Sequence, residues 1–477
     1  MAFGFSTEDG RNVRRKRTWN GGIMVNMTGK EILAATGGTL LCGREDTVLE
    51  HISIDSRTMK GNDLFVPIIG EKVDAHRFID QAFEHGAAAV LTSEHDVMES
   101  EKPWIRVDDT KKALQAVGSF YRDRLSLPLI GITGSVGKTT TREMVACALS
   151  SRYQVYKTPG NSNSQVGLPI TLCEITPEDE IGVIELGMSE PGELTVIARI
   201  ARIHMAVITN IGVAHIEQLG SRENIYREKL TIQDGLCENG ILFLNGDDDM
   251  LKDTKAKEGC RTIFYGTGEN SDYRAVDIHL EDGFPVFTAV HNQQKVSVRL
   301  SVMGSHNILN AMVSLAVAAE NGIPMEEAAK SLMSFHGYKN RQQIYDTGTF
   351  TVIDDTYNAS PVSMKAGLEV LSSITKAKRK IAVLADMKEL GDRSPEYHYE
   401  IGTYIAAHPV DCVVTLGELA GEIARAVREN APEITVKEFM EQEPLTAYLK
   451  EELKTGDCVL FKGSNSMKLG QVAEQFH

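Results

Sequence analysis

The 477-residue chain carries 50 Lys and Arg against 66 Asp and Glu, a net charge of −16, and 42% of its residues are hydrophobic. This length is typical of about three domains, and the apolar content excludes a largely disordered chain. The charge and a pI near 5.4 exclude a surface built to neutralise nucleic-acid phosphates. Local basic residues can still bind small anionic substrates. No apolar stretch approaches the ~20 residues of a membrane-spanning helix, so we expect no membrane span.

The first 26 residues differ from the rest because basic residues cluster at Arg11 and at 14–17, with no apolar run behind them. This pattern is not that of a secretion signal, and we interpret residues 1–26 as a flexible tail rather than a nucleic-acid-binding arm. The seven cysteines are scattered and form no metal-binding spacing. They are expected to be reduced thiols in a cytoplasmic protein.

After Met27, short β-rich runs alternate with helical stretches. Strands are expected at residues 63–69, 87–92, 104–107, 129–133, 182–186, 205–209, 241–244, 351–354, 380–384, 412–415 and 457–461. This alternation predicts βαβ units and mostly parallel sheets, so the fold class is α/β. Alternating residues in Asp277–Val302 indicate an antiparallel excursion. Ligands of parallel sheets bind where strands end, and the chemistry is therefore expected in the loops after these strands.

The composition and the order of these elements predict three domains after the tail. Residues 27–125 are expected to form a small N-terminal α/β domain. Residues 126–336 are expected to form a central domain with a P-loop-type, mostly parallel sheet. Residues 337–477 are expected to form a Rossmann-like C-terminal domain.

The strongest local motif is the glycine-rich segment after the strand at 129–133, which leads into a helix-forming stretch from Arg142. Glycines allow backbone N–H groups to surround a phosphate, the helix N-terminus favours negative charge, Lys138 adds a cation, and Thr139 can bind Mg²⁺. The segment is a shorter GxxGKT form of the Walker pattern, since Ile132 occupies the position of its first glycine. It predicts a phosphate-binding loop.

Three further residues are candidates for the same site. Glu185 ends a buried strand, where a metal-binding carboxylate belongs beside a phosphate loop. His215 follows the next strand, although most single histidines are structural. Lys229 lies on a helical stretch and is of interest only if it points inward, where burial can lower its pKa and make it nucleophilic towards CO₂.

The last third of the chain contributes polar residues at strand and helix ends. Asn307 and Asn310 are three residues apart, so both can face one ligand from one helix. A strand ends in Asp354 and Asp355, which suit ribose hydroxyls or an amine but are also typical of a capped turn. Lys462 follows the final strand in a similar layout.

These motifs occur in the same order as in the Mur ligases, the ATP-dependent peptide synthetases of peptidoglycan assembly, which the chain resembles from residue 27 to its end. They are Asp55-Ser56-Arg57, TGSVGKTTT (133–141), Asn161-Ser162-Asn163, ELGMS (185–189), TNIGVAHIEQLGS (209–221), GSHNILNA (304–311), DDTYNASP (354–361), ADMKELG (385–391) and FKGSNSM (461–467). ELGMS, DDTYNASP and ADMKELG are similar to the branch that adds D-alanyl-D-alanine. Ala75, Thr231 and Ser360 depart from the family pattern, all outside the phosphate loop.

The resemblance implies a role for each candidate residue. The ATP phosphates are implied to contact Gly134, Ser135, Val136, Gly137, Lys138, Thr139 and Thr140. Two Mg²⁺ sites are implied at Thr139, Glu185, His215 and Lys229, with Lys229 carbamylated by CO₂. Lys138, Lys229 and His215 are implied to be catalytic. The rest of the nucleotide is implied to contact Asn307, Asn310, Arg341 and Asp355. The other substrates are implied to contact Ser56, Arg57, Asn161, Asp354, Tyr357, Asn358 and Lys462.

The expected function is that of an ATP-dependent amide ligase adding D-alanyl-D-alanine to UDP-N-acetylmuramoyl-tripeptide through an acyl phosphate. The expected enzyme is a cytoplasmic monomer. One alternative is another amide ligase of the same superfamily, acting on diaminopimelate or glutamate. The second alternative is a nucleotide-binding regulatory or scaffold protein without catalysis, which the presence of Lys138, Glu185, His215 and Lys229 disfavours.

Overall fold

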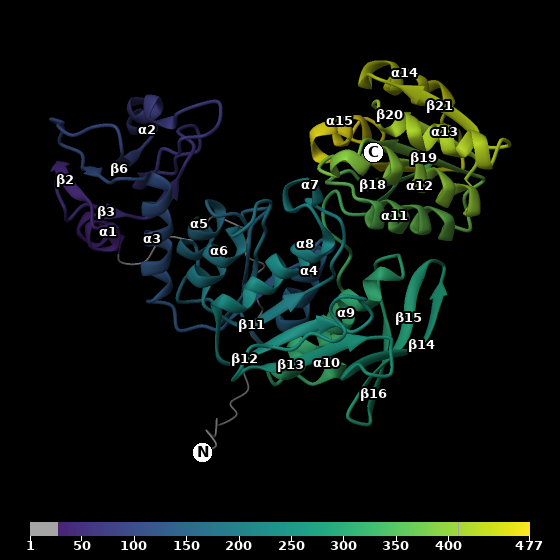
Figure 1. Cartoon of the computed structure of the whole chain (residues 1–477), viewed down its shortest axis with the longest axis horizontal. Coiled ribbons are helices and arrows are strands. Elements are labelled where there is room, and N and C mark those ends of the chain that lie inside the picture. The colour runs from purple at the N-terminus through teal and green to yellow at the C-terminus, as the bar shows by residue number, and fades with distance from the viewer. Residues whose placement is uncertain (1–26, 409) are drawn as a thin grey trace. The chain divides into compact units, whose positions relative to one another are not determined.

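The computed structural model describes residues 27–408 and 410–477, and the basic segment expected to be a tail lies outside them (Figure 1). The chain divides into two compact units. The described part of the first comprises residues 27–108 with Cys173–Thr176, and the second comprises Asp109–Leu172 with Pro177–His477. The helix at residues 110–122 therefore groups with the second unit, and the three-domain division stays a prediction.

The first unit contains a five-stranded sheet in the order β2-β7-β6-β5-β4, in which only β2 is antiparallel to its neighbour. Its elements are β1 (Met27–Thr28), α1 (Gly29–Thr36), β2 (Thr39–Cys42), β3 (Val48–Leu49), β4 (His51–Ser53), β5 (Asp63–Phe65), η1 (Ala75–Phe78), α2 (Ile79–Glu84), β6 (Ala87–Thr92) and β7 (Trp104–Arg106). The strand predicted to reach residue 69 ends at Phe65. Pro67 follows, and proline has no N–H to donate to a sheet.

The second unit contains a nine-stranded sheet in the order β16-β15-β14-β13-β12-β11-β8-β10-β9. Its strands are β8 (Leu129–Thr133), β9 (Val155–Lys157), β10 (Ile181–Glu185), β11 (Ile203–Ile208), β12 (Leu236–Asn245), β13 (Arg261–Gly266), β14 (Tyr273–Glu281), β15 (Phe284–His291) and β16 (Gln294–Arg299). Pairing is parallel from β9 to β14 and antiparallel from β14 to β16, which confirms the predicted antiparallel excursion.

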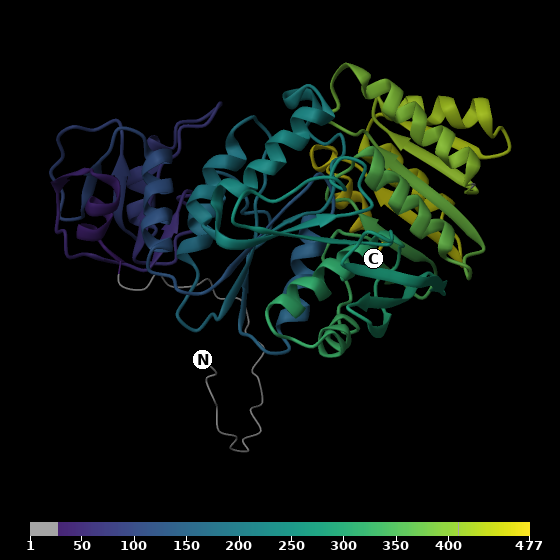
Figure 2. The same ribbon diagram turned by 60° about the horizontal axis from the view of Figure 1, so that its bottom comes forward.

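Helices lie on both sides of this sheet (Figure 2). They are α3 (Thr110–Arg122), α4 (Lys138–Leu149), α5 (Gly167–Cys173), α6 (Glu193–Ala201), α7 (Ile216–Leu219), α8 (Arg222–Leu230), η2 (Thr231–Gly235), α9 (His306–Glu320) and α10 (Met325–Leu332). Side chains of α4, α9 and α10 share one core with the sheet, in which Ile132, Met144, Phe243, Met312 and Leu332 are all buried. This packing holds the start of α4 at the end of β8.

The second sheet of this unit has six strands in the order β17-β18-β22-β19-β20-β21, all parallel except β17. Its strands are β17 (Gln343–Asp346), β18 (Thr351–Asp355), β19 (Arg379–Ala385), β20 (Cys412–Leu416), β21 (Thr435–Phe439) and β22 (Asp457–Lys462). Its helices are α11 (Pro361–Ser373), η3 (Gly391–Arg393), α12 (Ser394–Ala407), α13 (Ala420–Asn430), α14 (Gln442–Glu452), η4 (Asn465–Met467) and α15 (Leu469–Ala473). The first three α-helices pack on one face, and α14 and α15 on the other (Figure 1).

The observed architecture confirms the predicted α/β class, with parallel strands alternating with helices in every sheet of three or more strands. The strands expected at 351–354, 380–384, 412–415 and 457–461 are all present as part of one doubly wound sheet. Among residues 27–408 and 410–477, no helix is both long and apolar enough to span a bilayer.

Candidate functional site

The glycine-rich loop connects β8 to α4 and has the geometry of a phosphate-binding loop. Gly134 has φ +150°, and a Cβ there would lie 1.9 Å from the Thr209 hydroxyl oxygen, so no larger residue fits. Gly137 has φ +85° and directly precedes α4, which begins at Lys138. The two glycines therefore allow the chain to turn back on itself and aim the N-terminus of α4 at the space above the sheet.

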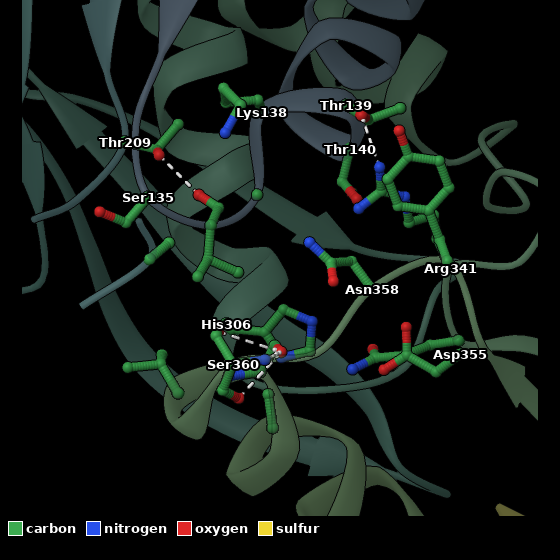
Figure 3. A pocket seen from close by; sticks show the side chains of 18 of the residues that line it. Ser135, Lys138, Thr139, Thr140, Thr209, His306, Arg341, Asp355, Asn358 and Ser360 are labelled. Atoms are coloured by element: carbon green, nitrogen blue, oxygen red, sulfur yellow. Dashed lines mark hydrogen bonds between the residues drawn. The ribbon is translucent and has the colours of Figure 1, made fainter. Parts of the chain in front are cut away.

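The loop after β11 holds the phosphate-binding loop in place. Thr209 Oγ1 donates to the Val136 carbonyl at 2.6 Å (Figure 3). Asn210 Oδ1 accepts the Val136 N–H at 3.0 Å, and Gly212 N donates to Ser135 Oγ at 2.8 Å. The sequence analysis singled out the TNIG motif but assigned no role to Thr209 or Asn210. Only the structure shows that they fix the neighbouring loop.

Two cations meet at the start of α4. Lys138 Nζ donates to the Gly134 carbonyl at 2.8 Å, and Arg341 Nη2 donates to Thr139 Oγ1 at 2.9 Å (Figure 3). The Arg341 guanidinium carbon lies 3.7 Å from the ring centroid of Tyr357. Burial and the neighbouring Arg341 lower the pKa of Lys138, against the opposing effect of Glu185. An anion placed here gains charge-assisted hydrogen bonds from both side chains.

Glu185 is held at the end of β10, and one of its oxygens accepts no hydrogen bond. Its side chain is 1% exposed, Oε2 accepts from Asn163 Nδ2 at 3.1 Å, and Arg142 Nη1 lies 3.7 Å from Oε1. Oε1 is buried and has no hydrogen-bond partner. An unsatisfied buried carboxylate oxygen facing a phosphate loop fits a Mg²⁺ ligand. In the part of the chain that the structure describes, no three His, Cys, Asp or Glu residues cluster into a metal site. A Mg²⁺ ion here must therefore take other ligands from hydroxyls, phosphates and water.

Lys229, on α8, is 2% exposed. Burial and the charge of Lys138 hold the pKa of the Lys229 amine well below its ordinary value, and Glu228 opposes this shift. The sequence alone could not show whether Lys229 points inward. The structure shows that it does, because its side chain lies inside the protein rather than in solvent. Lys229 does not itself line the cavity described below.

His215 follows β11 and adopts φ +61°, a left-handed conformation that non-glycine residues rarely take. Its Nδ1 lies 2.5 Å from Glu389 Oε2, and this contact lowers the pKa of Glu389. Glu389 belongs to the ADMKELG motif but was not among the predicted site residues. The sequence contains the motif but does not indicate that Glu389 contacts His215.

The two asparagines of α9 lie on one helix face, as their spacing predicts, but they mainly contact each other and the phosphate-loop helix. Asn310 Nδ2 donates to Asn307 Oδ1 at 3.0 Å, and Thr141 Oγ1 donates to Asn310 Oδ1 at 3.0 Å. Asn307 Nδ2 donates to the Met303 carbonyl at 2.7 Å. The amides therefore fix α9 against α4, and direct contact with a nucleotide remains a proposal.

Asp355 and Lys462 form a buried ion pair across the C-terminal sheet. Lys462 Nζ lies 2.7 Å from Asp355 Oδ2 and also donates to the Asn358 carbonyl at 3.1 Å. Asp355 is predicted to contact the nucleotide and Lys462 another substrate. The structure pairs the two with each other, because β18 and β22 are adjacent parallel strands that end at the same edge, and the substrate contacts stay predictions.

Asp354 points to the other side of β18, since neighbouring strand residues alternate. Its oxygens accept from Thr356 N at 3.1 Å, Thr356 Oγ1 at 2.6 Å and Asn340 Nδ2 at 2.8 Å. Asp354 does not line the cavity. The geometry is that of the capped turn, and it gives no support to a direct substrate contact.

Most of these groups, but not Lys229 or Asp354, line one cavity of about 1080 Å³. The predicted residues that line it are Ser135, Val136, Gly137, Lys138, Thr139, Thr140, Asn161, Glu185, His215, Asn307, Asn310, Arg341, Asp355, Tyr357, Asn358 and Lys462. His306 also lines it, although the sequence analysis gave it no role. Figure 3 shows Lys138, Thr139 and Arg341 on one side of this space and His306, Asp355 and Ser360 on another.

Ser56 and Arg57 belong to the first unit. Ser56 Oγ donates to Gln81 Oε1 at 2.9 Å, and the Arg57 guanidinium pairs with Asp55 at 2.7 Å. This arginine lowers the pKa of Asp55 to about 2. Arg57 is exposed and Ser56 is buried, so of the two only Arg57 offers an open side chain to a ligand.

Residues 48–122, 132–318 and 340–465 match the Mur ligase family catalytic domain, the Mur ligase middle domain and the Mur ligase glutamate ligase domain, respectively. The chain is 38% identical over 454 residues to the UDP-N-acetylmuramoyl-tripeptide–D-alanyl-D-alanine ligase of Bacillus subtilis, a match that covers 94% of this chain and 98% of that protein.

Solved structures agree with this match. MurF from Acinetobacter baumannii is 30% identical with a TM-score of 0.85, covering 94% of this chain and 98% of that one. The MurF ligase from Thermotoga maritima, solved in complex with ADP, is 29% identical with a TM-score of 0.79, covering 91% of this chain and 98% of that one.

Proposed function

The chain belongs to the Mur ligase family, and we propose that it uses ATP to join D-alanyl-D-alanine to UDP-N-acetylmuramoyl-tripeptide. The observation that carries this proposal is the glycine-rich loop, whose Lys138 shares one cavity with Glu185, His215 and Arg341. These groups can bind a nucleoside triphosphate and balance its charge. The name of the B. subtilis relative, which aligns over nearly its whole length, supplies the two other substrates.

The proposed reaction begins when the terminal carboxylate of the tripeptide attacks the γ-phosphate of ATP. The bond from the γ-phosphorus to the bridging oxygen breaks, ADP leaves, and an acyl phosphate forms. Lys138 and Arg341 offset the repulsion between the carboxylate and the triphosphate, because both place positive charge at the start of α4. The amine of D-alanyl-D-alanine then attacks the acyl carbon, phosphate leaves with its electron pair, and the amine loses a proton to the surroundings.

We propose that Thr139, Glu185 and His215 hold magnesium, which supplies positive charge at the phosphates. The support is chemical: a hydroxyl, an unsatisfied buried carboxylate oxygen and an imidazole line one cavity. We also propose that Lys229 reacts with CO₂ to give a carbamate and a released proton. Its lowered pKa favours the neutral amine that this reaction requires.

The remaining predicted residues are proposed to serve the other substrates. Ser56 and Arg57 of the first unit are proposed to contact the uridine nucleotide, and Asn161, Tyr357 and Asn358 the peptide or dipeptide. Asn307, Asn310 and Asp355 are proposed to border the nucleoside of ATP. We propose that the enzyme acts as a monomer in the cytoplasm.

A coupled assay of ADP formation tests the function directly. The enzyme is supplied with ATP, Mg²⁺, UDP-N-acetylmuramoyl-tripeptide and D-alanyl-D-alanine, and each component is omitted in turn. We expect ADP and phosphate to form in equal amounts only when all are present, and the product mass to equal the two substrates less one water. Parallel assays replace D-alanyl-D-alanine with meso-diaminopimelate or glutamate, each with the nucleotide acceptor of the corresponding ligase.

Two outcomes contradict the proposal in different ways. ADP formation that depends on meso-diaminopimelate or glutamate would assign the chain to another amide ligase. ADP binding without turnover of any acceptor would favour a non-catalytic nucleotide-binding protein. Lys454→Met is a suitable control for Lys138→Met, because both remove one lysine charge but Lys454 is exposed on a loop before β22.

A further inference from the structure

The loop after β19 is fixed at its base and presents one carboxylate at its tip. Met387 N donates to His398 Nε2 at 2.9 Å, and Lys388 N donates to Ser464 Oγ at 2.9 Å. The next residue, Glu389, adopts φ +64°. Because the two preceding residues are anchored, the position of Glu389 is determined by the C-terminal sheet rather than by a freely moving loop.

The carboxylate of Glu389 meets His215, which comes from the other sheet of the same unit. Glu389 Oε2 lies 2.5 Å from His215 Nδ1, a close contact whose angle is not that of a hydrogen bond, and Glu217 N donates to the Glu389 carbonyl at 3.4 Å. Both residues have left-handed backbones, φ +61° and +64°. Strained conformations of this kind persist only where the surrounding structure enforces them, and they are concentrated at functional sites.

Both residues of this contact line the cavity. The His215 side chain is 21% exposed and the Glu389 side chain is 51% exposed. An imidazole that donates its Nδ1 proton to a carboxylate keeps a free lone pair on Nε2. Histidines that bind metals are commonly oriented in this way by a second residue.

We propose that Glu389 is a positioning residue for His215. Its negative charge, 2.5 Å from Nδ1, favours the tautomer with the proton on that nitrogen, restrains the ring and leaves the Nε2 lone pair available to the cavity. This role depends on the proposed function only for the identity of the ligand that His215 binds. The contact also makes the ring orientation and tautomer of His215 depend on the C-terminal sheet. Glu389 belongs to the loop after β19, and His215 belongs to the loop after β11.

The first test is spectroscopic and needs no substrate. The full-length protein is labelled with ¹⁵N-histidine, and His215→Asn identifies the His215 signals in long-range ¹H–¹⁵N spectra. We expect the parent to carry its proton on Nδ1, and Glu389→Ala to shift His215 towards the Nε2–H form. Asp392→Asn, which changes an exposed carboxylate three residues away, should leave the spectrum unchanged. An unchanged His215 tautomer in Glu389→Ala would overturn the proposal.

The second test measures metal binding and turnover. We expect Glu389→Ala to weaken Mn²⁺ binding in the presence of ADP, measured by electron paramagnetic resonance, and to lower kcat by about 10- to 100-fold. The KM for D-alanyl-D-alanine should stay within about twofold. Glu389→Gln keeps an acceptor oxygen and should recover part of both losses, and Asp392→Asn should match the parent. Parent-like Mn²⁺ affinity and kcat in Glu389→Ala would overturn the role.

The two tests separate this proposal from the proposed function. If the parent fails to turn over D-alanyl-D-alanine, the function is wrong, but the tautomer and Mn²⁺ measurements still decide whether Glu389 positions His215. If the parent is active and Glu389→Ala leaves both the tautomer and the kcat unchanged, only the role of Glu389 is refuted.

Discussion

The buried ion pair between Lys462 and Asp355 allows a prediction about stability with a defined size. The side chains are 2% and 9% exposed, and their charged atoms are 2.7 Å apart. Lys462→Met removes the cation and leaves the Asp355 carboxylate buried without its partner, which typically costs about 3–5 kcal/mol. Asp355→Asn leaves the ammonium unpaired and should cost a similar amount. We therefore expect each variant to lower the melting temperature by on the order of 10 °C.

A double-mutant cycle then isolates the pair. Once one charge is gone, removing the other takes away the unpaired buried charge, so the double variant should be more stable than either single variant. The coupling energy should therefore be at least about 3 kcal/mol. Unfolding of the unliganded protein is followed in urea by circular dichroism, with the exposed Lys454→Met as the control, expected to stay within about 0.5 kcal/mol of the parent.

Two results of these measurements would contradict the prediction that Asp355 neutralises Lys462. If Lys462→Met unfolds within about 1 kcal/mol of the parent, or if the two single effects simply add, Asp355 does not neutralise Lys462. The ammonium would then be free for a substrate carboxylate or phosphate, as the sequence analysis expected. Gly367, where a Cβ would lie 3.2 Å from Lys462 Cδ and 3.4 Å from Asp355 Oδ2, shows how closely α11 packs against this pair.

Three further predictions follow from the site. Lys138→Met should lower kcat by about 10²–10³-fold, since it removes the cation at the transferred phosphoryl group. A variant that retains a tenth of the parent rate in a coupled phosphate assay would contradict this. Lys229→Met should raise the melting temperature at pH 7 in CO₂-free buffer. The folded pKa of Lys229 is lowered, so the unfolded chain binds that proton more tightly than the folded protein does. The parent should therefore gain stability relative to the variant as pH rises towards ~10.4, and a gap that stays constant with pH would refute the burial argument. Cys458, whose pKa burial raises to about 12, should resist iodoacetamide at pH 8 in the folded protein and react in guanidinium, as peptide mass spectrometry can check.

Residues fixed by local geometry could be predicted from the sequence. The phosphate loop is one continuous segment, and its glycines, lysine and threonine must lie together whatever the rest of the chain does. The carboxylate of Glu185 and the loop of His215 were also predictable, because parallel strands all deliver their following loops to one edge of the sheet. The fold class followed from the same alternation of strands and helices.

Partners that come from distant segments could not be predicted. Asn163 holds Glu185 from 22 residues away, and Lys462 meets Asp355 from 107 residues away. A local sequence pattern does not indicate which two charged side chains will pair, because the pairing depends on the register between strands. The alternation of strand side chains could have separated Asp354 from Asp355, but choosing which of the two faces the cavity requires the position of the neighbouring strand β22.

The cations of the cavity explain how an acidic chain can serve a polyanionic substrate. Burial and Lys138 lower the pKa of Lys229, and burial and Arg341 lower that of Lys138, so Lys138 and Arg341 lie close enough for their charges to repel one another. Such repulsion destabilises the unliganded protein, and a bound triphosphate relieves it. The attraction therefore arises in a cavity lined by buried cations, where charges interact more strongly than at the surface. A net charge of −16 is compatible with this arrangement, because the field at the phosphates is set by the few groups around them.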